Sequence, residues 1–247
     1  MVKSVIFDID NTLYDYDSAH AFAMSALEAY TKDHFYWDKN DTAAKIKAAY
    51  NEIEDQLGKK AAIHNRLIRF QRILENEGLP LYPHVLNMYD IYWNTLIDHA
   101  KPYKGLLEAL VQLRKEGITI GIGTNMTSYI QFRKLTKLGL LQYFNFVVSS
   151  EEADHEKPEK EMFLFCAHKA NCDPSLCLYI GDSLNHDIKG ALNAGMEALW
   201  FRPDRVPLPA GATLPVDYVS PSNPQNEIVP FFTDYSDLLE IIQQINR

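Results

Sequence analysis

The chain has no hydrophobic run that approaches the about 20 apolar residues needed to span a membrane. Its first residues, Met1 to Ser4, lead directly into a segment typical of a strand, so no signal peptide is expected and the cytoplasm is the predicted compartment. Cysteine is also scarce. The three cysteines, Cys166, Cys172 and Cys177, form no CxxC pair, which favours reduced thiols over a disulfide framework or a zinc site.

Positive charge is in deficit as well. The formal net charge is -9, the sequence pI is about 5.4, and no basic run is long enough to bind a nucleic-acid backbone. A nucleic-acid partner and a membrane partner are therefore not expected. A small anionic substrate stays compatible with this charge, because a local cation reverses the field within one pocket.

The composition is that of a folded globular protein, with 47% hydrophobic and 23% charged residues among 247. This length allows one large α/β domain, or a core with a modest second domain. The pattern along the chain favours the second arrangement. Residues 1–16 and 101–247 are predicted to form an α/β core, and residues 17–100 a helical domain inserted after the first strand.

The inserted segment shows apolar residues at helical spacing, and no convincing strand. On its first predicted helix these residues are Phe22, Ala26 and Ala29. Breaks near Trp37 to Asn40, at Gly58 and near Gly78 to Pro80 divide the segment into about four helices.

Strands and helices alternate in the predicted core, which indicates a Rossmann-like parallel sheet with helices on both faces. Pro158 is expected to open a helix that reaches about Ala170. The Pro-rich stretch from Arg202 to Phe231 is predicted to be a surface loop region, and a helix is expected near the C-terminus. The predicted strands are Val2 to Phe7, Ile118 to Gly123, Phe144 to Ser149, Leu176 to Ile180, Ala198 to Phe201 and Asp217 to Val219.

Polar side chains gather where these strands end or the following helices begin. Each is unremarkable alone, as a turn residue, a helix cap or a surface lysine. Together they are expected to meet in one crevice, because ligands of open parallel sheets bind outside the carboxyl ends of the strands. They are Asp8 and Asp10, Thr124 and Asn125, Lys157, and Asp182 with Asp187.

Four segments in this order resemble the signature motifs of haloacid dehalogenase-like hydrolases. They are Asp8-Ile9-Asp10-Asn11-Thr12, Thr124-Asn125, Lys157-Pro158 and Gly181-Asp182-Ser183-Leu184-Asn185-His186-Asp187. The match extends from the first strand to the last helix. The insertion is similar to the cap of the subgroup that includes pyrimidine nucleotidases and acylneuraminate or sugar phosphatases.

The resemblance implies a phosphatase. Asp8 is then the nucleophile that forms an aspartyl-phosphate, and Asp10 is the general acid and base. Thr124 and the backbone N–H of Asn125 hold phosphate oxygens. Lys157, placed at the start of a helix, neutralises the phosphate and keeps Asp8 ionised.

The same resemblance implies a Mg²⁺ cofactor. Its ligands are Asp8, the backbone carbonyl of Asp10, and Asp182, with Asp187 outside them or bound through water. The implied substrate is a small phosphorylated metabolite, either a nucleoside monophosphate or a sugar phosphate. The oligomeric state is left open.

Other functions share this fold. A haloacid dehalogenase is disfavoured by Asp10, because that family normally lacks a carboxylate there. A sugar phosphomutase has the same core residues, and a non-catalytic binding protein is expected to have lost at least one motif. Tyr14 and Tyr16, beside the insertion, are candidates either for lining the pocket or for core packing.

Overall fold

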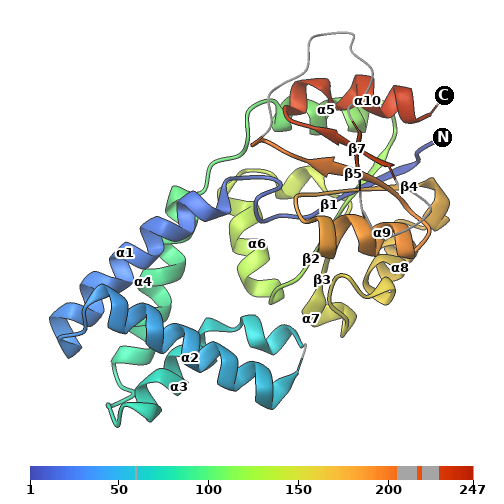
Figure 1. Ribbon diagram of the computed structural model, residues 1–247. Helices are drawn as coiled ribbons and strands as arrows, with labels where there is room; N and C mark the ends of the chain where they lie inside the picture. Colours follow the sequence, from blue (N-terminus) through green and yellow to red (C-terminus); the bar gives the residue numbers. More distant parts are fainter. Residues whose placement is uncertain (59, 205–215, 219–227, 247) are drawn as a thin grey trace.

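The structure is a computed structural model that describes residues 1–58, 60–204, 216–218 and 228–246. Within these residues the core is a seven-stranded sheet of order β3-β2-β1-β4-β5-β7-β6 (Figure 1). The strands are β1 (Ser4–Phe7), β2 (Thr119–Thr124), β3 (Phe146–Ser149), β4 (Cys177–Gly181), β5 (Glu197–Phe201), β6 (Val216–Tyr218) and β7 (Ile228–Phe232). All neighbours pair in parallel except β6 and β7, which pair antiparallel.

The strand order reverses at β1, which lies between β2 on one side and β4 on the other. The connection after β1 leads to β2 on one side, whereas the connection after β4 leads to β5 on the other, so the two diverge at the carboxyl ends of these strands and leave a crevice. The predicted site residues follow β1, β2 and β4, and the topology therefore places them around this crevice.

Both faces of the sheet are buried, as a parallel sheet requires. Val5 and Phe7 of β1 belong to one apolar cluster and Ile6 to another, because successive side chains of a strand point to opposite faces. Helices α5 (Leu106–Lys115), α6 (Ser128–Lys137) and α10 (Leu238–Ile245) contribute to the first cluster, and α8 (Lys160–Lys169) and α9 (Lys189–Asn193) to the second.

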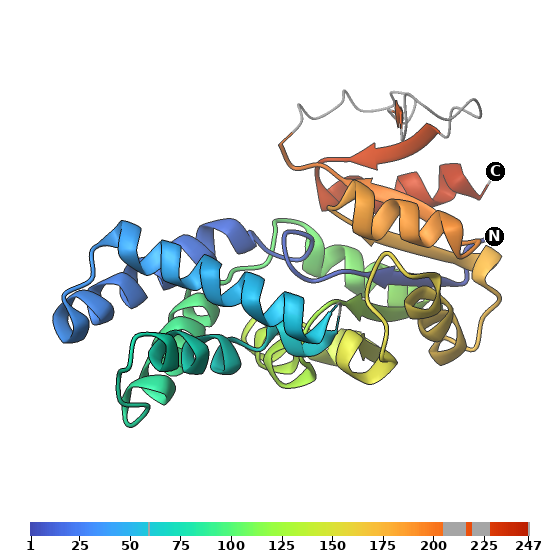
Figure 2. The same ribbon diagram turned by 60° about the horizontal axis from the view of Figure 1, so that its bottom comes forward.

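The segment between β1 and α5 forms a separate helical lobe beside the sheet (Figures 1 and 2). Its helix α1 packs against α4, and α2 packs against α3. The short turn η1 lies beside α7 (Ser150–Ala153) of the core, so the lobe touches the core away from its two connections. Its elements are α1 (Tyr16–Phe35), α2 (Lys39–Leu57), η1 (Ala61–His64), α3 (Arg66–Asn76) and α4 (His84–His99).

Short helical turns complete the described fold: η2 (Leu141–Tyr143), η3 (Pro174–Leu176), η4 (Leu184–Ile188) and η5 (Tyr235–Asp237). No helix among the described residues combines the length and apolar character needed to cross a bilayer. Cys166, Cys172 and Cys177 are free thiols, as expected.

The expectation of a loop from Arg202 to Phe231 is wrong at its end, because β7 begins at Ile228. Pro230 within this strand has no N–H to donate. However, β7 pairs with β5 through Phe231 and Phe232, so the missing donor lies outside that pairing. Residues 205–215 and 219–227 of the predicted loop, and Val219 of the last predicted strand, lie outside the described residues.

Two helix predictions are also corrected. Helix α8 begins at Lys160 rather than Pro158, and Lys157 therefore lies in the preceding connection, without the helix position assumed for it. In α1 the predicted face is wrong: Phe22 is 52% exposed, whereas Ala19 and Ala23 are buried. The buried residues of α1 are Ala19, Ala23, Leu27 and Thr31, and the helix packs mainly against α4.

Candidate active site

Asp8, Thr124 and Asp182 all lie at the carboxyl edge of the sheet, beside the point where the strand order reverses. Asp8 directly follows β1, Thr124 ends β2, and Asp182 directly follows β4. Asp8 and Thr124 are buried, while Asp182 is half-buried. The adjacent pairing of the three strands brings together residues that are 116 and 174 positions away from Asp8 in the sequence.

Lys157 is the centre of the polar network. Its Nζ donates to Asp8 Oδ1 at 2.6 Å and to Asp187 Oδ1 at 2.7 Å, with all three side chains buried. Burial alone lowers the pKa of Lys157, but the carboxylates of Asp187 and Asp8 outweigh it and raise the pKa well above its ordinary value. The lysine is therefore a fixed cation at neutral pH.

Burial raises the pKa of Asp8 to about 6, although Lys157 acts in the opposite direction. Asp8 is thus ionised at neutral pH, as a carboxylate nucleophile must be.

Asp182 completes a cluster of carboxylates with Asp8 and Asp187, in which one oxygen of each lies within 4.8 Å of the others. Burial, followed by the charges of Asp8 and Asp187, raises the pKa of Asp182 to about 8. Gly181 makes this approach possible, because a Cβ there would lie 2.4 Å from Asp187 Cγ.

The cluster fits a hard divalent cation. Its donors are carboxylate oxygens, which Mg²⁺ prefers, and three acidic groups face the single ammonium of Lys157. Asp187 is engaged through both oxygens, since Oδ2 also accepts from Ser183 N–H at 3.0 Å. Asp8 Oδ2 and the Asp182 carboxylate accept no hydrogen bond from a side chain of the described residues, so they are the better placed ligands.

Asp10 makes a different set of contacts. Lys134 Nζ lies 2.7 Å from each carboxylate oxygen, and the Tyr14 hydroxyl donates to Oδ1 at 2.7 Å. Lys134 comes from α6 and its side chain is fully buried, whereas the Asp10 side chain is 29% exposed. The carboxylate is therefore held in one orientation by two side chains while part of it stays accessible.

Thr124 and Asn125 are each held by a hydrogen-bond partner. Gln131 Nε2 donates to Thr124 Oγ1 at 2.7 Å, which leaves the hydroxyl proton of Thr124 free to donate elsewhere. The Asn125 side chain accepts from the backbone N–H of Lys157 at 2.8 Å and donates to its carbonyl at 3.1 Å. It thus ties the end of β2 to the connection that carries Lys157.

A cavity of about 250 Å³ opens beside Asp10. The core contributes Asp10, Asn125 and Met126, and the helical lobe contributes Tyr16, Arg66 and Trp93, with His64 and Arg69 nearby on its wall. Next to the cavity, His64 Nε2 lies 2.9 Å from Glu156 Oε1, one residue before Lys157. The lobe therefore completes a space that the core alone leaves open.

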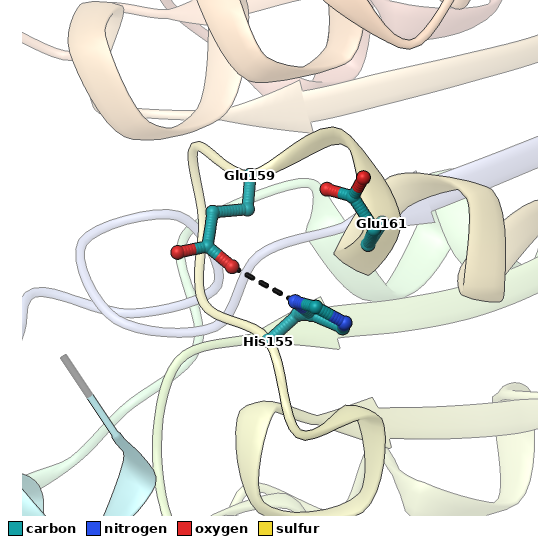
Figure 3. Close-up of side chains that lie close together, drawn as sticks. All are labelled: His155, Glu159 and Glu161. Carbon is teal, nitrogen blue, oxygen red and sulfur yellow. Dashed lines mark hydrogen bonds and ion pairs between the residues drawn. The ribbon is translucent and has the colours of Figure 1, made fainter.

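A second acidic cluster lies on the surface ahead of α8 (Figure 3). His155 Nδ1 is 2.9 Å from Glu159 Oε2, and these two side chains are 44% and 45% exposed. Glu161 faces the same spot from the first turn of the helix. Water solvates these groups, and no buried cation is needed to balance them.

Sequence reasoning missed Lys134, Gln131, Arg66 and Arg69. A signal for Lys134 exists in α6, because Ile130, Lys134 and Leu138 recur every fourth residue on one apolar face. A lysine in such a stripe is buried only if it has a partner. The identity of that partner, 124 residues away, is not visible in the sequence.

Comparison with known proteins agrees with this geometry. The family model of haloacid dehalogenase-like hydrolases matches residues 5–201. Ribulose-1,5-bisphosphate 5-phosphatase of Halopiger xanaduensis is 35% identical over 82% of this chain and 86% of its own length. Glyceraldehyde 3-phosphate phosphatase of Methanopyrus kandleri is 30% identical over 82% and 84%.

A pyrimidine 5'-nucleotidase of Escherichia coli is 30% identical over 84% of this chain and 89% of its own length. Among solved structures, a magnesium-bound hydrolase of Bacillus subtilis superposes with a TM-score of 0.68 at 24% identity, over 98% and 99% of the two chains. That likeness shows the fold. The chain belongs to the haloacid dehalogenase-like hydrolase family.

Proposed function

We propose that this protein is a magnesium-dependent phosphatase that hydrolyses a small phosphorylated metabolite through an aspartyl-phosphate on Asp8. The observation that carries the proposal is the position of Lys157, which bridges Asp8 and Asp187 beside Asp182. This arrangement gives one ionised nucleophile, one fixed cation and a set of oxygen donors at one edge of the sheet. Those are the groups that phosphoryl transfer needs.

Asp8 attacks phosphorus through a carboxylate oxygen. Lys157 stays within reach of the phosphate oxygens and offsets their charge, and the Thr124 hydroxyl donates its free proton to one of them. Asp8, the carbonyl of Asp10 and Asp182 would hold Mg²⁺, which would supply further positive charge to the phosphate when bound. Asp187 holds Lys157 in place from the other side.

Asp10 protonates the leaving oxygen and later takes a proton from the attacking water. Its place on the wall of the cavity supports this role, because the organic part of the substrate then lies next to the group that protonates it. Lys134 and Tyr14 orient the carboxylate. Asp10 also argues against dehalogenation, in which a halide leaves without a proton.

The helical lobe, residues 17–100, acts as a cap over the core formed by residues 1–16 and 101–247. It supplies Arg66 and Trp93 to the cavity, so it contacts the leaving group rather than the phosphate. Such a lobe excludes water from the reaction and selects among leaving groups.

The substrate class proposed is a sugar phosphate or a nucleoside monophosphate. The relatives support this range, because their names include a sugar bisphosphate, a triose phosphate and pyrimidine nucleotides. The cavity of about 250 Å³ favours the smaller leaving groups, since sites for drug-sized ligands measure about 300–1,000 Å³.

The test is hydrolysis of p-nitrophenyl phosphate by the purified protein. Activity is expected with Mg²⁺, loss of activity in excess chelator, and recovery when Mg²⁺ is restored. Asp8→Asn is expected to remove turnover, whereas Asp33→Asn, at an exposed residue of α1, is the matched control and should keep it. Release of inorganic phosphate from sugar phosphates, without an isomeric product, separates hydrolysis from mutase activity. Full turnover of Asp8→Asn, or of the wild type in chelator, would overturn the proposal.

A further inference from the structure

Two arginines of the helical lobe are buried on the wall of the cavity beside Asp10. Arg66 and Arg69 lie on α3 and are only 9% and 8% exposed. Both line the cavity, together with Asp10 and Asn125 of the core. Arginines are rarely buried to this extent unless an anion or several acceptors surround the guanidinium.

No protein anion balances either guanidinium. Among the described residues, no carboxylate lies within 4.0 Å of Arg66 or Arg69. The nearby carboxylates are engaged elsewhere: Asp10 with Lys134, and Glu156 with His64.

Among the described residues, each arginine donates one hydrogen bond and lies over an aromatic ring. Arg66 Nη2 lies 3.4 Å from the Tyr16 hydroxyl, and its guanidinium stacks over the Tyr92 ring at 3.8 Å. Arg69 Nη2 donates to the Ile63 carbonyl at 3.1 Å. These contacts fix the position of the two groups but leave most of their donors unused.

Two buried donors on the same wall have no hydrogen-bond partner at all among the described residues, Arg69 Nε and the indole Nε1 of Trp93. Burial, followed by the neighbouring charge of Arg66, lowers the pKa of Arg69 to about 10. Arg69 is therefore still charged at neutral pH. Two adjacent cations with unused donors, in a chain of net charge -9, form a local site for an anion.

We infer that the leaving group of the substrate carries a second anionic group, a phosphate or a carboxylate, which binds to Arg66 and Arg69. The planar fork of a guanidinium donates two parallel hydrogen bonds to either anion, and burial strengthens them. This inference rests on the proposed phosphatase function and narrows its substrates to compounds with two anionic groups. The size of the cavity fits a short carbon chain between them.

The first experiment compares matched substrates with the wild-type enzyme. 3-Phosphoglycerate and glycerol 3-phosphate differ by a carboxylate, and a pentose 1,5-bisphosphate and the pentose 5-phosphate differ by a phosphate. The member of each pair with the second anion is expected to have a kcat/KM higher by on the order of 10- to 100-fold, because hydrogen bonds to charged groups have this effect. A preference in only one pair identifies the anion as carboxylate or phosphate, and no preference in either pair would overturn the inference.

The second experiment uses Arg66→Met and Arg69→Met, which keep the side-chain length but remove the charge. Each is expected to abolish most of the preference, measured as the ratio of kcat/KM values within each substrate pair. Arg72→Met is the matched control, because Arg72 lies on the same helix and pairs with Glu52 outside the cavity. Retention of the preference in both cavity variants would contradict the inference.

The two proposals fail separately. If the wild-type enzyme hydrolyses p-nitrophenyl phosphate but shows no preference for substrates with a second anion, the proposed function stands and the inference fails. If it hydrolyses no phosphomonoester, the proposed function fails, and calorimetric titration with 3-phosphoglycerate and with a pentose 1,5-bisphosphate then tests the arginine site directly. The arginine site is supported if Arg66→Met weakens the binding of either compound at least tenfold and Arg72→Met leaves it unchanged. It is contradicted if the wild type and both variants bind the two compounds equally well.

Discussion

Replacing Asp10 with asparagine separates its catalytic role from its structural one. Lys134 donates to both oxygens of Asp10 at 2.7 Å, and its own side chain is fully buried. In Asp10→Asn one oxygen becomes an NH₂ group, which offers Lys134 no lone pair. The variant therefore loses the negative charge that balances a buried ammonium and keeps one acceptor.

The structure sets the size of the stability loss. Removing one partner of a buried ion pair typically costs about 3–5 kcal/mol. The lower end, about 3 kcal/mol, is expected here because the Asp10 side chain is 29% exposed and the amide oxygen still accepts. Urea unfolding of the metal-free protein measures this loss. The double variant Asp10→Asn/Lys134→Met removes the unbalanced ammonium and is expected to recover most of the stability without recovering activity.

The kinetics respond to the leaving group. Nitrophenolate leaves without a proton, so formation of the aspartyl-phosphate is expected to survive in Asp10→Asn. Attack by water lacks its base and is expected to slow by about 10²–10⁴-fold. Stopped-flow absorbance should then show a burst of nearly one equivalent of nitrophenolate, followed by slow turnover and accumulation of phosphoenzyme.

An alkyl phosphate provides the control, because its leaving oxygen needs the proton that the variant cannot supply. The burst is expected to disappear, since the first step now limits the rate. Near wild-type turnover of both substrates by Asp10→Asn would show that Asp10 is not the acid and base. A burst with the alkyl phosphate would show that another group protonates the leaving oxygen.

Three further predictions concern the carboxylate cluster. The pKa of Asp182 is raised to about 8, so below pH 8 a bound proton must leave before a cation binds. The affinity for Mg²⁺, measured by calorimetry, should therefore rise by up to about tenfold per pH unit from pH 6 to 8 and then level off. An affinity that does not change with pH would refute this prediction. Gly181→Ala places a Cβ 2.4 Å from Asp187 Cγ, which should displace that carboxylate. We expect kcat to fall at least tenfold while the far-UV circular dichroism spectrum changes little. An unchanged kcat would mean that the position of Asp187 is not critical. In an acid-quenched single turnover, mass spectrometry should find a phosphoryl group on Asp8 before phosphate is released; release of phosphate without any phosphorylated Asp8 would mean that water attacks the substrate directly.

The sheet core was predictable because its signals are local. The strand that ends at Phe7 and the one that ends at Thr124 are short apolar runs followed by polar residues, and the rules for parallel sheets place such ends on one edge. The short strand β7 was missed because the stretch from Arg202 to Phe231 is Pro-rich, and proline disfavours strands. Its pairing with β5 depends on which residues of β7 meet that strand, and this is a property of the assembled sheet.

The candidate site residues were predicted as a set, and the structure brings several of them together, but their contacts were not predictable. The order of the motifs identifies Asp10, yet no residue near it in the sequence indicates its contact with Lys134, because the two residues are 124 positions apart. The face of α1 was assigned wrongly for a similar reason, because packing against α4 decides which side of α1 is buried. Arg66 and Arg69 look like ordinary helix residues until the core closes the cavity around them.

The two hydrogen bonds from the Asn125 side chain to the backbone of Lys157 have a consequence for the rate. The Asn125 amide donates to the carbonyl and accepts from the N–H of one residue, Lys157. A residue of a neighbouring β-strand pairs with both groups of its partner in the same way. The ammonium is thus held in place when the chain folds, and in the proposed mechanism the binding of a phosphate would not have to order it at the expense of conformational entropy. Aspartate lacks the donor and glutamine is one methylene longer, so asparagine meets this requirement where its nearest chemical relatives do not.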